Sequence, residues 1–286
     1  MGHLTKLIIG TAQFGLNYGI NNTLGKINRE SIQNVLNYSV ENNILYLDTA
    51  NQYGDAQVNI GEINGGRFNI ISKFPKVDSV GELNSEFQST LKALRLDKIY
   101  AYLAHSADNL VQNPEIWDNL LKFKYHNKIE KIGFSLYNTT QLEKLLKMNI
   151  IPDIVQIPFS LLDRKFEPFF GELKTFGIEI HIRSVFLQGL YFIDPNNLPV
   201  NLIGLSSDLL SINNICNKYN TDINLLALNY AYFHPYVDKV VIGIDSLDHL
   251  KKNCDFLKFG ALNSEILNEV NRINVKEIEL LNPTNW

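Results

Sequence analysis

One pattern, a short apolar strand followed by a polar loop and an amphipathic helix, recurs about eight times along this chain of 286 residues. The expected strands are 6–10, 44–47, 68–73, 99–103, 130–134, 153–157, 178–182 and 239–242. A helix between successive strands leaves room for the crossover that parallel neighbours need. The repeat therefore predicts an α/β fold, a closed (β/α)8 TIM barrel, as one domain over residues 1–286.

The expected helices carry recognisable start signals. These are Asn28, Ser79 with Glu82 as a capping box, Asn138 with Gln141, and Ser246. Other helices are expected at 114–125, 168–176, 208–218, 222–233 and 263–271, with one more ending near 65–66. The segment 184–207 contains Pro and several Asn and is too long for a plain connector, so we expect a functional loop there.

An open, doubly wound sheet is the alternative fold. Such a sheet usually carries a Gly-rich phosphate loop directly after its first strand. Here the first strand is followed by Gly-Thr-Ala-Gln-Phe-Gly at 10–15, which lacks the required glycine spacing. The closed barrel is therefore the preferred prediction.

Polar residues gather where the expected strands end. They are Asp48, Lys73, His105, Ser135, Gln156, Arg183 with Ser184, and Gly243. Taken singly, each has an ordinary structural explanation: Lys73 can be a solvated lysine, His105 a core histidine, and Asp48 a turn cap. Because the carboxyl ends of barrel strands meet at one rim, their joint occurrence instead predicts an active site.

Three of these positions, Asp48, Lys73 and His105, suit carbonyl chemistry together with Tyr53. The loop after the second strand places Asp48 and Tyr53 five residues apart. A tyrosine is a weak acid at neutral pH, and we expect the Lys73 ammonium to lower its pKa. A lysine at a barrel rim needs a carboxylate partner, which Asp48 supplies, and His105 can orient a carbonyl oxygen.

In their order and strand positions, these motifs resemble the aldo/keto reductase family. The matching stretches are Leu-Asp-Thr-Ala with Tyr-Gly at 47–54, Ile-Ser-Lys at 71–73, Tyr-Leu-Ala-His at 102–105, Ile-Gly-Phe-Ser at 132–135, Val-Gln at 155–156, and Val-Ile-Gly at 241–243 with Asn253 downstream. The resemblance implies an oxidoreductase that reduces an aldehyde or ketone, with a keto-sugar as one option. Asp48, Tyr53, Lys73 and His105 fall on its catalytic tetrad, with Tyr53 as the general acid.

The same resemblance implies a nicotinamide cofactor, NADP(H) first and NAD(H) as the alternative. Ser135 and Gln156 would hold the carboxamide, while Arg183 stands where many relatives have an aromatic residue against the nicotinamide. The remaining cofactor positions implied by the resemblance are Gly10, Thr11, Ser184, Phe186, Gln188, Gly243, Asp245, Ser246, His249 and Asn253. Because Asp245 and His249 replace the usual basic residues near the adenosine 2′-phosphate, we expect weak discrimination between the two cofactors.

Other functional classes stay open at this point. Lys73 can form a Schiff base with pyridoxal phosphate, and His105 with His181 and a carboxylate can bind a metal. A barrel that binds the cofactor as a sensor or subunit without turnover is a third alternative. The order of the motifs disfavours the first two, no histidine pair shows metal spacing, and the complete tetrad disfavours the third. We therefore expect no metal.

Charge and cysteine content limit the partners. Thirty acidic residues against 26 Lys and Arg give a formal net charge of −4 without blocks of like charge, which disfavours nucleic acid and membrane surfaces as partners. Cys216 and Cys254 form no disulfide framework, and the amino-terminal sequence lacks a secretory signal, so a cytoplasmic location is expected. A small carbonyl compound is the expected partner. The expected pocket-wall aromatics are Phe14, Tyr18, Tyr137, Tyr191 and Phe192.

Overall fold

Eight parallel strands close into a barrel in sequence order, each pairing with the next and β8 with β1. The computed structural model describes residues 4–19, 25–63 and 66–286. Its strands are β1 (Leu7–Gly10), β2 (Tyr46–Asp48), β3 (Asn69–Phe74), β4 (Ile99–Ala104), β5 (Ile129–Ser135), β6 (Ile154–Pro158), β7 (Glu179–Arg183) and β8 (Lys239–Gly243). The predicted (β/α)8 barrel is confirmed.

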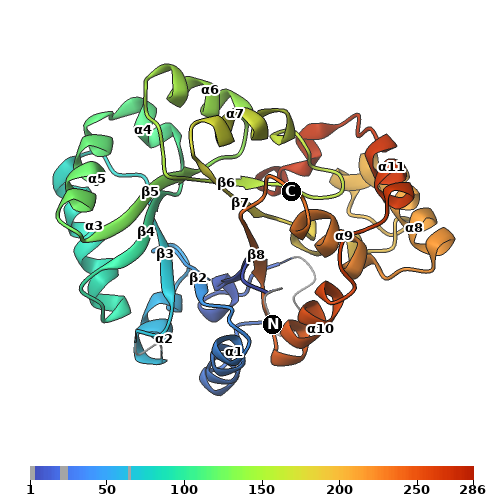
Figure 1. Ribbon diagram of the computed structural model, residues 1–286, viewed down its shortest axis with the longest axis horizontal. Helices are drawn as coiled ribbons and strands as arrows, with labels where there is room; N and C mark the ends of the chain where they lie inside the picture. The colour runs from blue at the N-terminus through green and yellow to red at the C-terminus, as the bar shows by residue number, and fades with distance from the viewer. Residues whose placement is uncertain (1–3, 20–24, 64–65) are drawn as a thin grey trace.

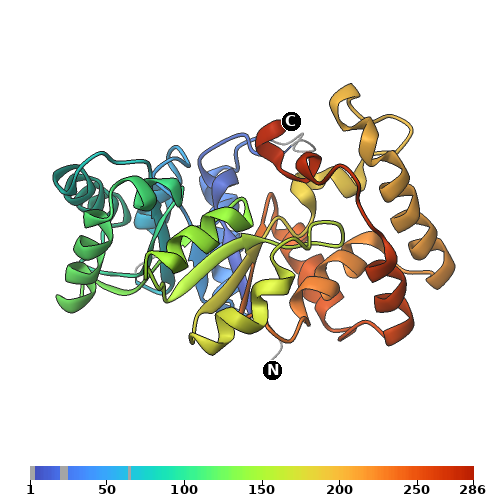
Figure 2. The ribbon, with the colours of Figure 1, turned by 90° about the horizontal axis from the view of Figure 1, so that it is seen from above.

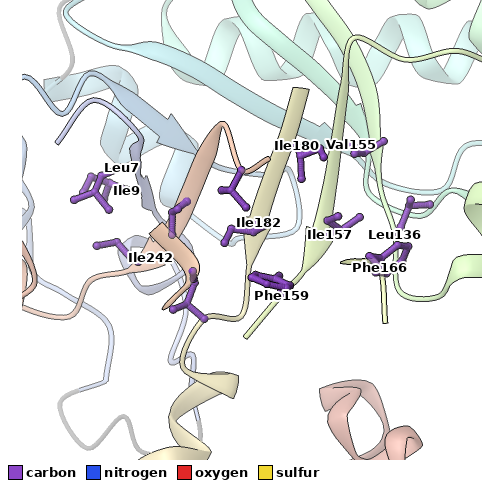
Figure 3. Packing of buried hydrophobic residues seen from close by; sticks show 14 of the residues in the cluster. Leu7, Ile9, Leu136, Val155, Ile157, Phe159, Phe166, Ile180, Ile182 and Ile242 are labelled. Carbon is purple, nitrogen blue, oxygen red and sulfur yellow. The ribbon is translucent and has the colours of Figure 1, made fainter. Parts of the chain in front are cut away.

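Alternation along each strand separates two apolar layers. Successive side chains of a strand point to opposite faces, so one set fills the barrel and the other faces the helices. Ile8, Ile71, Ala101, Leu103, Ile154 and Val241 form the inner cluster. Their neighbours in sequence belong to the larger outer cluster, where Figure 3 shows side chains of β6 and β7 packed together with Phe159.

Helices surround the barrel strands, as Figure 1 shows. They are α1 (Arg29–Glu41), α2 (Ala56–Ile63), α3 (Val80–Leu94), α4 (Asp108–Gln112), α5 (Glu115–Tyr125), α6 (Thr139–Lys147), α7 (Phe170–Thr175), α8 (Ser206–Tyr219), α9 (Ile223–Tyr232), α10 (Leu247–Leu257) and α11 (Ser264–Arg272). Short α4 was not predicted. In Figure 2, α8 lies at the outer edge of the molecule, where it contacts α9 and α11. No helix among the described residues has both the length and the apolar character needed to cross a membrane.

Short 3-10 helices occupy several connections. They are η1 (Ala12–Phe14), η2 (Glu167–Phe169), η3 (Leu187–Phe192), η4 (Val200–Leu205), η5 (Ile278–Leu281) and η6 (Pro283–Asn285). The expected irregular segment 184–207 therefore contains two of them. The expected helix end near 65 lies outside the described residues.

Side-chain caps confirm most predicted helix starts. Asn28, Asn138 and Ser246 each accept a backbone hydrogen bond from the first turn of their helix. At α3, Ser79 accepts from the Glu82 backbone, but the Glu82 side chain accepts from the Asp78 N–H. The predicted capping box is thus only half formed there, whereas Asn138 and Gln141 make both of its bonds.

Strand register brings the predicted site residues to one rim. Gly10 of β1 pairs with Asp48 of β2 on one side and with Gly243 of β8 on the other. Ser135 and Gln156 face each other across β5 and β6. Since all strands run parallel, these residues lie at or near the carboxyl ends of their strands, on the face of the barrel where TIM-barrel enzymes carry their active sites.

Candidate active site

A cavity of about 430 Å³ opens among the loops that follow the strands. Its size lies within the range of small-molecule and cofactor sites. All four residues expected to be catalytic line it: Asp48, Tyr53, Lys73 and His105. Residues from β2, β3 and β4 or directly after them thus meet in one space.

The base of the cavity is a buried ion pair. Lys73 Nζ lies 2.5 Å from Asp48 Oδ1, and the two residues are 1% and 3% exposed. The other Asp48 oxygen accepts a hydrogen bond from Gln156 Nε2 at 2.6 Å. Burial lowers the pKa of Lys73, although the Asp48 carboxylate opposes this shift.

The loop after β2 is held at both ends. The Thr11 backbone and hydroxyl both donate to the Asp48 carbonyl at 2.9 Å. Farther along, the Asn51 backbone donates to the Lys73 carbonyl, while its side chain donates to Glu86 of α3 and accepts from Thr90. These bonds connect the loop to the barrel and to α3, and so determine where Tyr53 stands.

Close backbone packing beside Tyr53 requires a glycine. A Cβ atom built on Gly15 would lie 1.8 Å from the Tyr53 carbonyl oxygen, which is an impossible contact. Only a residue without a side chain lets the loop after β1 pass this closely against the loop after β2. Gly15 thereby supports the position of Tyr53 from the opposite side of the loop.

Tyr53 and His105 lie together above the ion pair. Their rings meet edge to face with centroids 5.9 Å apart, and Lys73 Nζ lies 5.3 Å from the Tyr53 ring centroid. Burial and the Asp48 carboxylate raise the pKa of Tyr53. The expected lowering by Lys73 is therefore wrong for this structure, because the paired Asp48 carboxylate neutralises the lysine charge.

His105 is a neutral side chain at physiological pH. Burial and the positive charge of Lys73 lower its pKa to about 4. Its Nδ1 atom is buried without a hydrogen-bond partner among the described residues. A neutral imidazole can donate one hydrogen bond and accept another, so His105 is suited to binding a polar group inside the cavity.

Most residues expected to bind the cofactor also line the cavity. They are Gly10, Thr11, Ser135, Gln156, Arg183, Ser184, Phe186, Gln188, Gly243, Asp245 and His249. Two others do not. The Ser246 hydroxyl caps α10 by accepting from the His249 N–H at 3.1 Å, and Asn253 is fully buried with both amide atoms unpaired within the described structure.

At the other side of the cavity, Asp245 pairs with His249. The Asp245 Oδ1 atom lies 2.8 Å from His249 Nδ1, one helical turn away at the start of α10. The hydrogen bond from His249 lowers the pKa of Asp245, so this carboxylate stays ionised at neutral pH. The sequence pattern singled out both residues but did not predict their mutual bond.

The aromatic residues expected to line the pocket divide into two groups. Tyr18, Tyr137 and Phe192 lie on the cavity wall. Phe14 and Tyr191 belong to the core instead, with exposures of 0% and 5%, so the prediction is wrong for these two. Apolar residues on a loop can turn toward a core or a pocket, and the sequence pattern does not distinguish the two cases.

Several wall residues were not among the predicted site residues, including Gln13, Leu16 and Gln52. Gln13 lies in the loop after β1, and its Oε1 atom is buried without a partner among the described residues. It also contacts Gly243, since a Cβ atom built there would lie 2.8 Å from Gln13 Nε2. Its position directly after a strand was the only available signal.

The residues that could bind a metal ion do not gather in the described part of the chain. Among the residues described, no group of three or more His, Cys, Asp or Glu side chains is placed to hold a metal ion. His181, considered above as a ligand, is fully buried within β7, and its Nε2 atom lies 3.3 Å from Glu179.

Comparisons with known proteins agree with this geometry. The model of the aldo/keto reductase family matches residues 6–275. A relative from Arabidopsis thaliana, named pyridoxal reductase, chloroplastic, is 24% identical over 285 residues, which cover 83% of this chain and 75% of the relative.

Solved structures share the fold at lower identity. An aldo-keto reductase from Bacillus halodurans, in its holo form, has a TM-score of 0.75 at 20% identity and covers 94% of this chain and 92% of its own. One from Klebsiella pneumoniae, in complex with NADP and acetate, has a TM-score of 0.70 at 20% identity, with 93% and 90% covered. With the family model matching nearly the whole length, this chain belongs to the aldo/keto reductase family.

Proposed function

We propose that this protein uses NADP(H) to reduce an aldehyde or ketone to an alcohol. The observation that carries the proposal is the buried Lys73–Asp48 pair with Tyr53 and His105 directly above it in one cavity. The Tyr53 phenol can protonate a carbonyl oxygen as a general acid, and the His105 imidazole can hold that oxygen by a hydrogen bond.

Each of the four residues then has a distinct task. Tyr53 donates its proton to the carbonyl oxygen, and its raised pKa keeps that proton in place at neutral pH. Neutral His105 orients the same oxygen by a hydrogen bond. Lys73 and Asp48 form a buried ion pair beneath Tyr53 and His105, and Gln156 donates a hydrogen bond to the second Asp48 oxygen.

The cavity suits a nicotinamide cofactor. Ser135 and Gln156 offer polar groups at the wall, and Gln13 Oε1 is buried without a partner among the described residues. When bound, the cofactor supplies the hydride that reduces the carbonyl carbon. The Klebsiella relative solved with NADP supports NADP(H) as the first choice, and the pyridoxal reductase supports an aldehyde substrate.

The direct test is a substrate screen. We expect the pure protein to bind NADPH and to oxidise it when aldehydes, keto-sugars or keto-acids are added. The measurements are the fluorescence change on NADPH binding and the loss of NADPH absorbance during turnover. Binding without turnover across the panel would favour the sensor alternative. Failure to bind either reduced cofactor would contradict the proposal.

The pH dependence of carbonyl reduction follows from the shifted pKa values of Tyr53, His105 and Lys73. We expect neither Tyr53 nor His105 to limit kcat/KM for reduction around neutral pH, because Tyr53 keeps its proton and His105 stays neutral there. At more alkaline pH, Lys73 loses its proton before an ordinary lysine does and leaves Asp48 unpaired, so activity falls. Ionisation of the Tyr53 phenol near neutral pH, followed by ultraviolet absorbance in wild type against Tyr53→Phe, would contradict its raised pKa.

Cofactor preference depends on Asp245. Its carboxylate is on the cavity wall and stays ionised, so we expect it to repel the 2′-phosphate of NADPH and to leave only a small preference over NADH. Asp245→Asn should raise the NADPH/NADH ratio of kcat/KM by about fivefold, since one unit charge near a phosphate contributes roughly 1 kcal/mol in water.

A neighbouring substitution controls for this change. Asp248→Asn removes the same charge from the first turn of α10, but Asp248 is exposed and does not line the cavity. It should leave the NADPH/NADH ratio unaltered. A strong wild-type preference for NADPH that Asp245→Asn does not change would show that Asp245 lies away from the phosphate.

A further inference from the structure

Arg183 ends β7 and places its guanidinium at the cavity wall. One face of the group packs on Tyr137, with Cζ 4.5 Å from the ring centroid. Two of its nitrogens are held in place: Nη2 donates to the Leu136 carbonyl at 2.9 Å and Nη1 to Ser184 Oγ at 3.2 Å. These contacts fix the plane of the guanidinium but use only two of its five N–H donors.

The charge of Arg183 has no paired carboxylate among the described residues. Of the carboxylates on the cavity wall, Asp48 is bonded to Lys73 and Gln156, and Asp245 is bonded to His249. Asp163 lies near enough for Arg183 to affect its pKa, yet its Oδ2 atom bonds to Lys165 at 2.6 Å. Arg183 is therefore a cation of the cavity wall that forms no ion pair with a carboxylate within the described structure, although the buried Asp163 attracts it from beyond ion-pair distance.

The field of this cation reaches the catalytic end of the cavity. Besides burial, the positive charge of Arg183 contributes to lowering the pKa of both Lys73 and His105. His105 itself is neutral, and the charge of Lys73 is matched by Asp48 at 2.5 Å. The excess positive charge that an approaching substrate meets thus comes from Arg183.

We infer that Arg183 makes this cavity selective for carbonyl compounds that also carry an anionic group, a carboxylate or a phosphate; this inference rests on the proposed carbonyl reduction. A half-buried guanidinium with free N–H donors and no ion-paired carboxylate is completed by a planar carboxylate or a phosphate oxygen pair, which it can bind through two parallel hydrogen bonds. Neutral aldehydes leave its remaining donors without an anionic acceptor.

Matched pairs of ligands test the inference by binding. Isothermal titration calorimetry, with and without NADP⁺, compares para-(hydroxymethyl)benzoate with its methyl ester, in which a methyl group replaces the negative charge. We expect wild type to bind the carboxylate about tenfold more tightly or better, because hydrogen bonds to charged groups are the stronger kind. Arg183→Gln should remove this preference, while Arg183→Lys, which keeps the charge, should retain part of it.

A control variant and a turnover measurement complete the design. Lys92→Gln removes one positive charge from the exposed face of α3, outside this cavity, and should keep the wild-type preference. In turnover, the kcat/KM ratio of para-carboxybenzaldehyde to methyl para-formylbenzoate should fall in Arg183→Gln by the same factor as in binding. Glycolaldehyde phosphate against glycolaldehyde extends the comparison to phosphates and shows which of the two anions is preferred.

Three results would overturn the inference. The first is the absence of any carboxylate preference in wild type, and the second is a preference that persists in Arg183→Gln. The third is a loss of NADP⁺ affinity in Arg183→Gln with an equal fall in kcat/KM for both aldehydes, which would assign Arg183 to cofactor binding. A carboxylate preference in binding that depends on Arg183, without turnover of any aldehyde, would support the anion site and contradict the proposed reduction.

Discussion

Tyr53→Phe is expected to lower kcat for carbonyl reduction by about 10²- to 10⁴-fold while NADPH affinity stays nearly the same. The substitution removes only the phenolic hydroxyl, and the ring can keep its edge-to-face contact with His105. Because the hydroxyl acts on the carbonyl oxygen during the chemical step, its loss affects the transition state rather than binding. Single-turnover kinetics with pre-bound NADPH measures this step directly.

The matched control is Tyr46→Phe. Tyr46 begins β2, the strand that ends at Asp48, but it packs against the inner apolar cluster and does not line the cavity. Its variant should keep the wild-type single-turnover rate. If Tyr53→Phe also retains most of that rate, another group protonates the carbonyl and the assignment of Tyr53 as general acid is wrong.

Lys73→Met is expected to abolish most activity and also to lower the free energy of unfolding by about 3–5 kcal/mol. Lys73 and Asp48 are both almost completely buried, so the substitution leaves a carboxylate in the barrel with Gln156 as its remaining side-chain partner. Urea unfolding followed by circular dichroism measures the change.

Two further variants separate the buried charge from other effects. Asp48→Asn combined with Lys73→Met removes both charges and should be more stable than Lys73→Met alone. Lys124→Met breaks the Lys124–Asp153 pair, whose side chains are 39% and 30% exposed, and should cost only about 1 kcal/mol or less. A double variant no more stable than Lys73→Met would show that lost side-chain packing, not the unpaired carboxylate, causes the destabilisation.

Local sequence predicted the barrel because each of its signals acts over short distances. Strand alternation, helix periodicity and caps such as Asn28 and Asn138 depend on neighbouring residues, and the structure places strands where the apolar runs were found. The convergence of Asp48, Lys73 and His105 on one cavity was also predictable, since parallel strands of a closed barrel must end at the same rim.

Other features depend on contacts between residues far apart in the chain. Gln156 lies 108 residues from the Asp48 carboxylate that it binds, and Arg183 lies 47 residues from the Leu136 carbonyl that holds it. Likewise, Phe14 packs into the core while Tyr18, four residues later, lines the cavity, and Asn253 is buried away from the wall. No periodicity or motif spacing encodes such pairings.

The residue types and their order along the chain therefore determined the fold class and the set of ionisable groups at the rim. Only the tertiary structure decided the state of those groups. The direction of a pKa shift depends on burial and on the nearest charge, and both exist only after the barrel has closed. This is why Tyr53 was expected to have a lowered pKa and instead has a raised one: burial and the Asp48 carboxylate raise it, and the Lys73 ammonium expected to lower it is paired with Asp48.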